Sequence, residues 1–278
     1  MGWVLFILTL LLGITLYLKG FLIFRTETKK NSCRTYFETL LDSLDDMEEK
    51  AVYGEDSARI VRAEREKAEK AEQRMRDLDY IRENYASAEY AGYTFDVDDK
   101  PDSKDSQVMR RYVEKWPEIK AKNIGLLLSG NCGTGKTFYA CCIANAVRSR
   151  YGEKVMVYSL PKLIAVMGRN FGTDAETWER RLETYGLVVL DDLGVERDTE
   201  YQNEKAQEII DIRTRANKPL IVTTNISVAE FKEAKDITRE RMYSRIIGAC
   251  TPYTMTGADR RIEKAREKLK ESREVLGL

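Results

Sequence analysis

Short apolar runs alternate with longer mixed segments along this chain. Residues 187–190 and 220–222 are continuous aliphatic runs, and a third apolar run covers residues 124–129. Runs of this kind are typical of strands buried on both faces of a parallel sheet, with helices in the intervening segments. Together with strands expected near residues 155 and 250, the pattern predicts a three-layer α/β fold around a parallel five-stranded sheet.

The segments around these strands have helical patterns. Helices are predicted over residues 107–116, 138–147, 201–216 and 259–275. Upstream, residues 47–85 are dense in Glu, Lys, Arg and Ala, with pairs such as Glu66 and Lys70 at i, i+4 spacing. This composition indicates a long exposed helix, and its apolar positions do not sustain the heptads of a coiled coil.

Composition changes divide the chain into three regions. We expect a hydrophobic helix over residues 1–24, then a charged helical segment over residues 25–105 that ends in the polar linker 96–106. Residues 106–278 form the predicted α/β domain, with a charged C-terminal helix.

A glycine-rich loop separates the first strand from its following helix. Its eight residues are Gly130, Asn131, Cys132, Gly133, Thr134, Gly135, Lys136 and Thr137. Glycines let the backbone wrap a triphosphate without Cβ clashes, and Lys136 adds positive charge for the β- and γ-phosphates. The Thr137 hydroxyl lies where a magnesium ligand is needed. The alternative is a chance glycine turn, but the strand-loop-helix order favours a site for a nucleoside triphosphate and Mg²⁺; the resemblance described below specifies ATP.

Polar residues follow the next two predicted strands. Asp191 and Asp192 come directly after the run 187–190, and Asn225 follows the strand that begins at Leu220. Ligands of open parallel sheets bind at the carboxyl ends of the strands, so Asp191 can hold magnesium through water and Asp192 can polarise the attacking water. Asn225 is placed to contact the γ-phosphate or to position that water. Asp and Asn also serve as simple turn residues.

Five motifs in this order resemble the AAA+ ATPases of the bacterial DnaC and DnaI helicase loaders and the IstB transposition helpers. The motifs lie within residues 105–261 and are GNCGTGKT, LVVLDDLG, the helix 201–216, KPLIVTTN and RERMYSRI. The resemblance implies an ATPase that assembles side by side as a homo-oligomer, binds single-stranded DNA and helps to place a ring-shaped replicative helicase on it.

The resemblance also implies roles for individual residues. Residues 130–137 match the Walker A loop, Asp191 and Asp192 the Walker B pair, and Asn225 the first sensor. Arg245 matches the arginine finger and Arg261 the second sensor, although arginines on charged helices often do no more than pair and solvate. Many AAA+ proteins have Glu at the position of Asp192, so we expect slow hydrolysis.

Composition limits the remaining chemistry. The 278 residues contain no histidine, which excludes histidine acid-base catalysis and histidine metal ligands. Five cysteines form no C-x-x-C pair, so structural zinc and a disulfide framework are not expected. Forty-six basic residues balance forty-six acidic ones, so any DNA path must be local. One such path is offered by Arg169, Asn170, Phe171, Arg180 and Arg181.

The N-terminus is strongly apolar. Residues 3–24 would form a helix about 33 Å long, enough to cross a hydrocarbon core of about 30 Å. The basic residues that follow Phe24 favour a cytoplasmic ATPase anchored to the inner face of the membrane. A cleaved signal peptide is disfavoured because the start lacks basic residues. An added segment that the functional protein lacks is the other alternative.

The motifs therefore predict an ATP-hydrolysing helicase-loader-like protein that acts in DNA replication. A transposition helper would use the same site. A protein of another class, a membrane-tethered nucleotide-dependent interaction protein, remains a further alternative.

Overall fold

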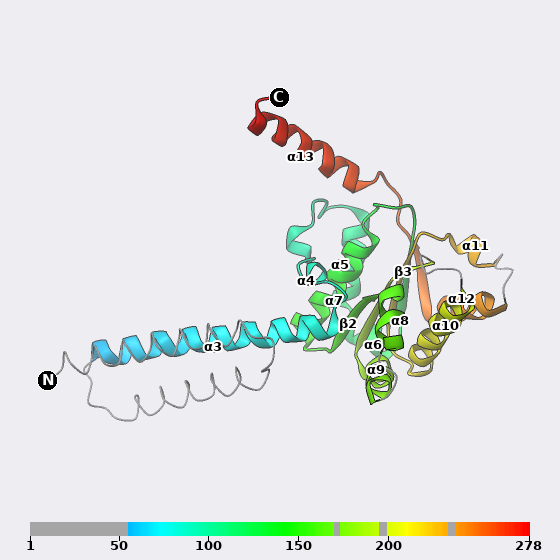
Figure 1. The fold of residues 1–278 in the computed structure, drawn as a ribbon, viewed down its shortest axis with the longest axis horizontal. Helices are drawn as coiled ribbons and strands as arrows, with labels where there is room; N and C mark the ends of the chain where they lie inside the picture. The colour runs from blue at the N-terminus through cyan, green and yellow to red at the C-terminus, as the bar shows by residue number, and fades with distance from the viewer. Residues whose placement is uncertain (1–54, 170–172, 195–198, 233–236) are drawn as a thin grey trace. The chain divides into compact units, whose positions relative to one another are not determined.

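The computed structural model describes residues 55–169, 173–194, 199–232 and 237–278 (Figure 1). The chain divides into two compact units, residues 1–80 and 81–278. The first contains most of helix α3 (Glu55–Asn84), whose ion pairs include Arg65 with Glu69 and Arg76 with Glu72, each at 3.0 Å. The described part of the predicted charged helix is thus helical.

A parallel five-stranded sheet forms the centre of the second unit. Its strands are β1 (Gly125–Ser129), β2 (Val155–Ser159), β3 (Leu187–Leu193), β4 (Leu220–Thr224) and β5 (Cys250–Thr254). Their order across the sheet is β2-β3-β4-β1-β5, and every neighbouring pair is parallel. The predicted fold class and all five predicted strand positions are confirmed.

Helices cover both faces of the sheet (Figure 1). Before β1 the chain forms α4 (Ala88–Ala91), the 3₁₀ helix η1 (Phe95–Val97), α5 (Lys104–Glu114) and α6 (Trp116–Ala121). After it come α7 (Lys136–Tyr151), α8 (Leu160–Arg169), α9 (Thr173–Thr184), α10 (Glu200–Arg215), α11 (Val228–Lys232), α12 (Ile237–Ala249) and α13 (Arg260–Leu276). Helix α7 packs against the sheet, and α4 and α5 pack against α7, whereas α8, α10 and α12 lie on the other side, where α10 contacts both α8 and α12.

Helix α7 packs on the sheet, and half of its buried positions are small. Ala140, Cys141, Cys142 and Ala144 are fully buried, and so are the aliphatic side chains of β1 and β3 that face the helices. Each large aliphatic side chain buried in this way contributes about 1.5–3 kcal/mol. This packing fixes the start of α7, and hence the glycine loop, against the sheet.

Strand order determines where the predicted site residues meet. Strands β3, β4 and β1 are consecutive neighbours, and all three run in the same direction. Their carboxyl ends therefore bring together the segments that begin at Gly130, Asp191 and Asn225. At the opposite end of the sheet, the buried Arg213 of α10 donates hydrogen bonds to four backbone carbonyls. These belong to Leu182, Tyr185, Gly186 and Pro219, at 2.6–3.1 Å.

Among the helices of the described ranges, none is long and apolar enough to cross a membrane. The predicted membrane span, residues 3–24, lies outside those ranges.

Candidate nucleotide-binding site

The glycine loop adopts a backbone that other residues would strain. Gly130, Gly133 and Gly135 have φ values of 140°, 77° and 101°. A Cβ atom added at Gly130 would lie 2.1 Å from the Met255 carbonyl oxygen, and one at Gly133 would lie 1.8 Å from a carboxylate oxygen of Asp259. The loop therefore needs glycine for its conformation and for its close contacts.

Lys136 joins the glycine loop to the end of β4. Its ammonium group donates to the carbonyl oxygens of Gly130 at 2.8 Å and Asn131 at 2.7 Å, and to Oδ1 of Asn225 at 2.8 Å. Burial lowers the pKa of Lys136, while Cys132, Asp192 and Asp191 oppose that shift. The structure thus brings the predicted phosphate-binding lysine and the predicted first sensor into contact.

Asp191 accepts hydrogen bonds from three hydroxyl groups. Thr137 donates to its Oδ1 at 2.8 Å, Thr223 donates to the same oxygen at 2.6 Å, and Tyr90 donates to Oδ2 at 3.1 Å. Asp191 itself is only 1% exposed. A hydroxyl that donates its hydrogen to a carboxylate keeps its lone pairs for a cation, and oxygen ligands suit Mg²⁺. Thr137 and Asp191 therefore fit the predicted magnesium site.

Asp192 occupies a turn in the backbone. Its φ is 58°, the β3–β4 register shifts between Leu190 and Leu193, and its N–H donates to the Thr223 hydroxyl at 3.0 Å. Short polar side chains such as Asp tolerate this left-handed conformation better than longer ones. This preference gives a physical reason for Asp rather than Glu at this position. Burial, followed by the charge of Asp191, raises the pKa of Asp192, whereas Lys136 and Arg261 lower it.

The remaining loop residues line the same site. The Thr134 hydroxyl donates to the Asn131 carbonyl oxygen at 3.0 Å, which braces the loop internally. Cys132 is exposed, and its sulfur lies 3.5 Å from a guanidinium nitrogen of Arg261. The predicted second sensor is thus beside the glycine loop, where its charge also reaches Lys136 and Asp192.

Arg245 lies apart from these residues. It belongs to α12 and forms an ion pair at 2.7 Å with Asp211 of α10, and its side chain is 42% exposed. Within the described residues the structure therefore does not join Arg245 to the glycine loop of its own chain. Its role as an arginine finger stays a prediction.

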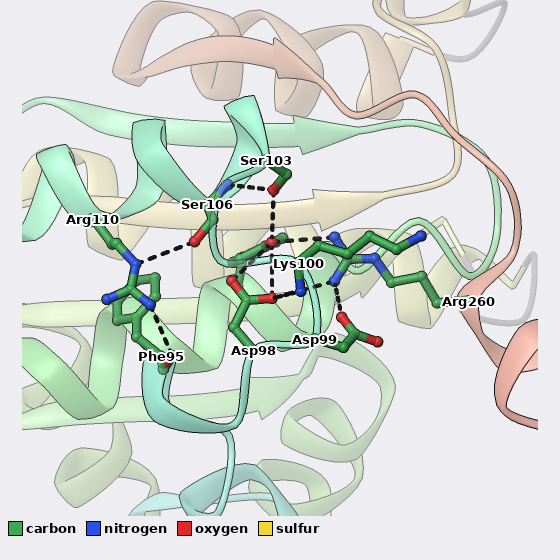
Figure 2. A network of polar contacts seen from close by, with 9 residues as sticks. Phe95, Asp98, Asp99, Lys100, Ser103, Ser106, Arg110 and Arg260 are labelled. Atoms are coloured by element: carbon green, nitrogen blue, oxygen red, sulfur yellow. Dashed lines mark hydrogen bonds and ion pairs between the residues drawn. The ribbon is translucent and has the colours of Figure 1, made fainter.

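The start of α13 is fastened to the glycine loop by Arg260. Its N–H donates to the Gly133 carbonyl oxygen at 3.0 Å, and its guanidinium donates to Asp99 at 2.9 Å and to the Tyr139 hydroxyl at 3.1 Å. Figure 2 shows Arg260 reaching from one side of this network to Asp98 and Asp99. The network connects the segment before α5, helix α7 and the C-terminal helix.

Asp98 is the buried centre of that network. It accepts from the Tyr139 hydroxyl at 3.1 and 3.2 Å and from the N–H of Lys100 at 3.0 Å (Figure 2). The sequence places Asp98 in a polar linker, yet the residue is only 9% exposed. The linker interpretation overlooked these contacts because both partners of Asp98 in α7 and α13 lie far away along the chain.

The unpredicted residues of this region include Tyr90, Thr223, Arg260 and Asp98. Thr223 sits in the predicted strand before Asn225, so its proximity to Asp191 could have been inferred from the parallel pairing. Tyr90 precedes Asp191 by 101 positions, and no local pattern indicated the contact.

The proposed DNA path is only partly described. Asn170 and Phe171 lie outside the described residues. Arg181 donates to the Glu83 carbonyl oxygen at 2.9 Å and lies over the Trp178 ring, 4.9 Å from its centre. Arg180 is exposed. Arg181 thus has intramolecular partners, and DNA contact along this path remains a prediction.

Comparison with known proteins agrees with this arrangement. The replicative helicase loader DnaC of Escherichia coli (strain K12) is 29% identical over 140 residues, 49% of this chain and 54% of that protein. The helicase loader DnaI of Bacillus subtilis (strain 168) is 24% identical over 208 residues, 69% of this chain and 66% of that protein. The chain thus spans about half the length of the DnaC relative.

Solved structures show the same fold. The crystal structure of the DnaC helicase loader has a TM-score of 0.53 at 24% identity, covering 61% of this chain and 100% of that chain. The structure of DnaI has a TM-score of 0.52 at 22% identity, covering 63% of this chain and 94% of that one. The family of IstB-like ATP binding proteins matches residues 34–267, most of the sequence. The chain belongs to that family of IstB-like ATP binding proteins.

Proposed function

We propose that this chain binds ATP with Mg²⁺ at the glycine loop and hydrolyses it slowly. The observation that carries the proposal is the convergence of three separate segments. Lys136 contacts Asn225 at 2.8 Å, and Thr137 contacts Asp191 at 2.8 Å. A nucleotide-binding P-loop enzyme needs these same groups for its phosphates and its cation.

Each group has a distinct role in the proposed reaction. The loop amides and Lys136 bind the phosphates, and Thr137 with Asp191 holds the cation, which neutralises phosphate charge when bound. Asp192 and Asn225 orient the attacking water. Arg261, beside Cys132, adds positive charge at the same loop.

Hydrolysis in this proposal needs a second copy of the chain. Arg245 is partly exposed and has its partner Asp211 on a neighbouring helix of the same chain. A guanidinium supplied from an adjacent subunit can stabilise the charge that develops on the transferred phosphoryl group. We therefore propose that Arg245 acts in trans within a homo-oligomer.

The cellular role that we propose is that of a helicase loader in DNA replication, binding single-stranded DNA and a replicative helicase. The names of the relatives DnaC and DnaI support this role. The match to IstB-like proteins supports a second candidate, a transposition helper ATPase. Recovery of a ring helicase in a pull-down would separate the loader from the transposition helper.

The direct test is the ATPase rate of the purified chain with and without single-stranded DNA, with Lys136→Ala as the blank. We expect a slow rate that DNA increases and that the variant lacks. A rate equal to that of the blank would contradict ATP hydrolysis. A rate indifferent to DNA would contradict the replication role and favour a nucleotide-dependent interaction protein at the membrane, anchored through residues 3–24.

A further inference from the structure

Tyr90 reaches the proposed magnesium site from a part of the chain that precedes the sheet. It lies in the short helix α4, and its hydroxyl donates to Oδ2 of Asp191 at 3.1 Å. None of the sequence motifs indicated that Tyr90 would contact this site. The contact therefore adds a residue to the site that the phosphate-binding and acidic motifs do not contain.

The position of Tyr90 is fixed by contacts with α7. Asn145 of α7 donates to the carbonyl oxygens of Tyr90 and Tyr93, each at 2.8 Å, and accepts a hydrogen bond from the Tyr85 hydroxyl at 2.7 Å. At the start of α4, the Ser87 side chain accepts from the N–H of Glu89. The segment before η1 is thus held against the same helix that begins with the phosphate-binding lysine.

The three hydroxyl donors together bond to both carboxylate oxygens of Asp191. Oδ1 accepts from Thr137 and Thr223, and Oδ2 accepts from Tyr90. Burying a carboxylate is costly unless its oxygens are hydrogen-bonded. Because the donors come from α7, β4 and α4, the carboxylate is restrained from three directions.

The Tyr90 hydroxyl is the donor in this contact, because an ionised carboxylate can only accept hydrogen bonds.

We propose that Tyr90 is a positioning residue of the magnesium site: its hydroxyl holds Asp191 in the orientation in which Oδ1 faces the Thr137 hydroxyl. The inference rests on the proposed function, since it assigns the cation to Thr137 and Asp191. Residues that orient metal-binding groups through hydrogen bonds change metal affinity strongly when they are removed. Tyr90 acts through Asp191 and leaves phosphate binding to the glycine loop.

Tyr93 is a matched control in the same segment. Its ring centre lies 6.1 Å from that of Tyr90 and 5.5 Å from that of Phe138, but its hydroxyl donates to the exposed Glu89. Tyr90→Phe and Tyr93→Phe each remove one hydroxyl from neighbouring rings. Only the first removes a hydrogen bond to Asp191.

The test is binding of a fluorescent ATP analogue to the full chain, measured in EDTA and over a Mg²⁺ titration. We expect Tyr90→Phe to bind the analogue in EDTA as tightly as the unmodified chain, which shows that the variant is folded. The Mg²⁺ concentration at the midpoint of its binding titration should rise by about tenfold. Tyr93→Phe should have the midpoint of the unmodified chain.

An unchanged midpoint in Tyr90→Phe, or an equal rise in Tyr93→Phe, would overturn the role of Tyr90. Asp191→Asn separates this failure from that of the proposed function. If Asp191→Asn loses the Mg²⁺ response while Tyr90→Phe keeps it, the magnesium site stands and Tyr90 has no part in it. If the unmodified chain shows no Mg²⁺ response, the proposed magnesium site fails, and the role of Tyr90 fails with it.

Discussion

The glycine loop and helix α12 place their charged residues in opposite settings. At the site of the loop, Lys136 and Asp191 are buried. Lys136 donates to two loop carbonyls and to Asn225, and Asp191 accepts from hydroxyls of α4, α7 and β4, all at 2.6–3.1 Å. On α12, Arg245 is 42% exposed and pairs with Asp211 of the adjacent α10. The groups for nucleotide binding are therefore assembled within one chain, whereas the predicted finger is not joined to them.

Nucleotide binding and ATP hydrolysis should therefore be separable by substitution. Substitutions at the loop should weaken binding itself, because Lys136 and the groups that position it lie within one chain. Substitution of Arg245 should leave binding intact and act only on the chemical step, since its contribution awaits another subunit.

Replacement of Arg245 by Ala should have the largest effect. We expect the ATPase rate to fall by about 1,000-fold, because an arginine finger stabilises charge in the transition state. The affinity for an ATP analogue should stay unchanged, since Arg245 contacts Asp211 rather than the loop. Arg241→Ala on the same helix is the control. Equal rates for Arg245→Ala and the unmodified chain would exclude the finger role.

Replacement of Lys136 by Ala should weaken nucleotide binding itself by about 100-fold, because removal of a buried charge partner costs several kcal/mol. Titration calorimetry with ATP and Mg²⁺ measures the change. Lys154→Ala, at the residue before β2, serves as the control for loss of a lysine charge. Retention of full affinity in Lys136→Ala would show that the loop is not the phosphate site.

Accessibility of the thiols should report occupancy of the loop. Cys132 is exposed, whereas Cys141, Cys142 and Cys250 are buried, and burial raises the pKa of Cys250 to about 12. Because thiolate is the reactive form, Cys250 should stay inert to alkylation at pH 8, and only pH values near its raised pKa would ionise it.

The labelling experiment uses a Cys33→Ser background and mass spectrometry. ATP at ten times its dissociation constant should slow alkylation of Cys132 by about tenfold. Labelling of Cys132 at the same rate with and without ATP would contradict nucleotide binding at this loop.

Replacement of Asp211 by Ala should have the smallest effect. A partly exposed ion pair contributes about 0–1 kcal/mol, so the free energy of unfolding should fall by no more than about 1 kcal/mol in a denaturant titration. The ATPase rate should persist in Asp211→Ala and collapse in Arg245→Ala. A collapse in both would show that the arginine serves the α10–α12 contact and has no separate function.

The sequence was sufficient for the parts of the site that follow local patterns. Continuous aliphatic runs identified β3 and β4, and the rule that ligands bind at the carboxyl ends of parallel strands placed Asp191 and Asn225 together. The glycine loop is a run of consecutive residues, and its pattern alone indicates phosphate binding. These parts could be predicted because each depends on neighbours in the chain or on the geometry of a parallel sheet.

The contacts of Tyr90, Asp98 and Arg260 could not be predicted in this way. Arg260 bonds to Asp99 across 161 positions, and Tyr90 to Asp191 across 101. Such pairs form only after α4, α7 and α13 have packed, and no periodic pattern records them. A polar stretch between helices resembles a linker whether or not its carboxylates become buried.

The central claim is that one chain suffices for nucleotide binding, whereas hydrolysis needs two. Its most direct test is the ATPase rate of a mixture of Lys136→Ala and Arg245→Ala. Neither variant alone should hydrolyse ATP. In the mixture, Lys136→Ala subunits retain Arg245 and can complete sites on Arg245→Ala subunits that retain the loop, so a measurable part of the unmodified rate should return. A mixture as inactive as its separate components would contradict an arginine supplied in trans.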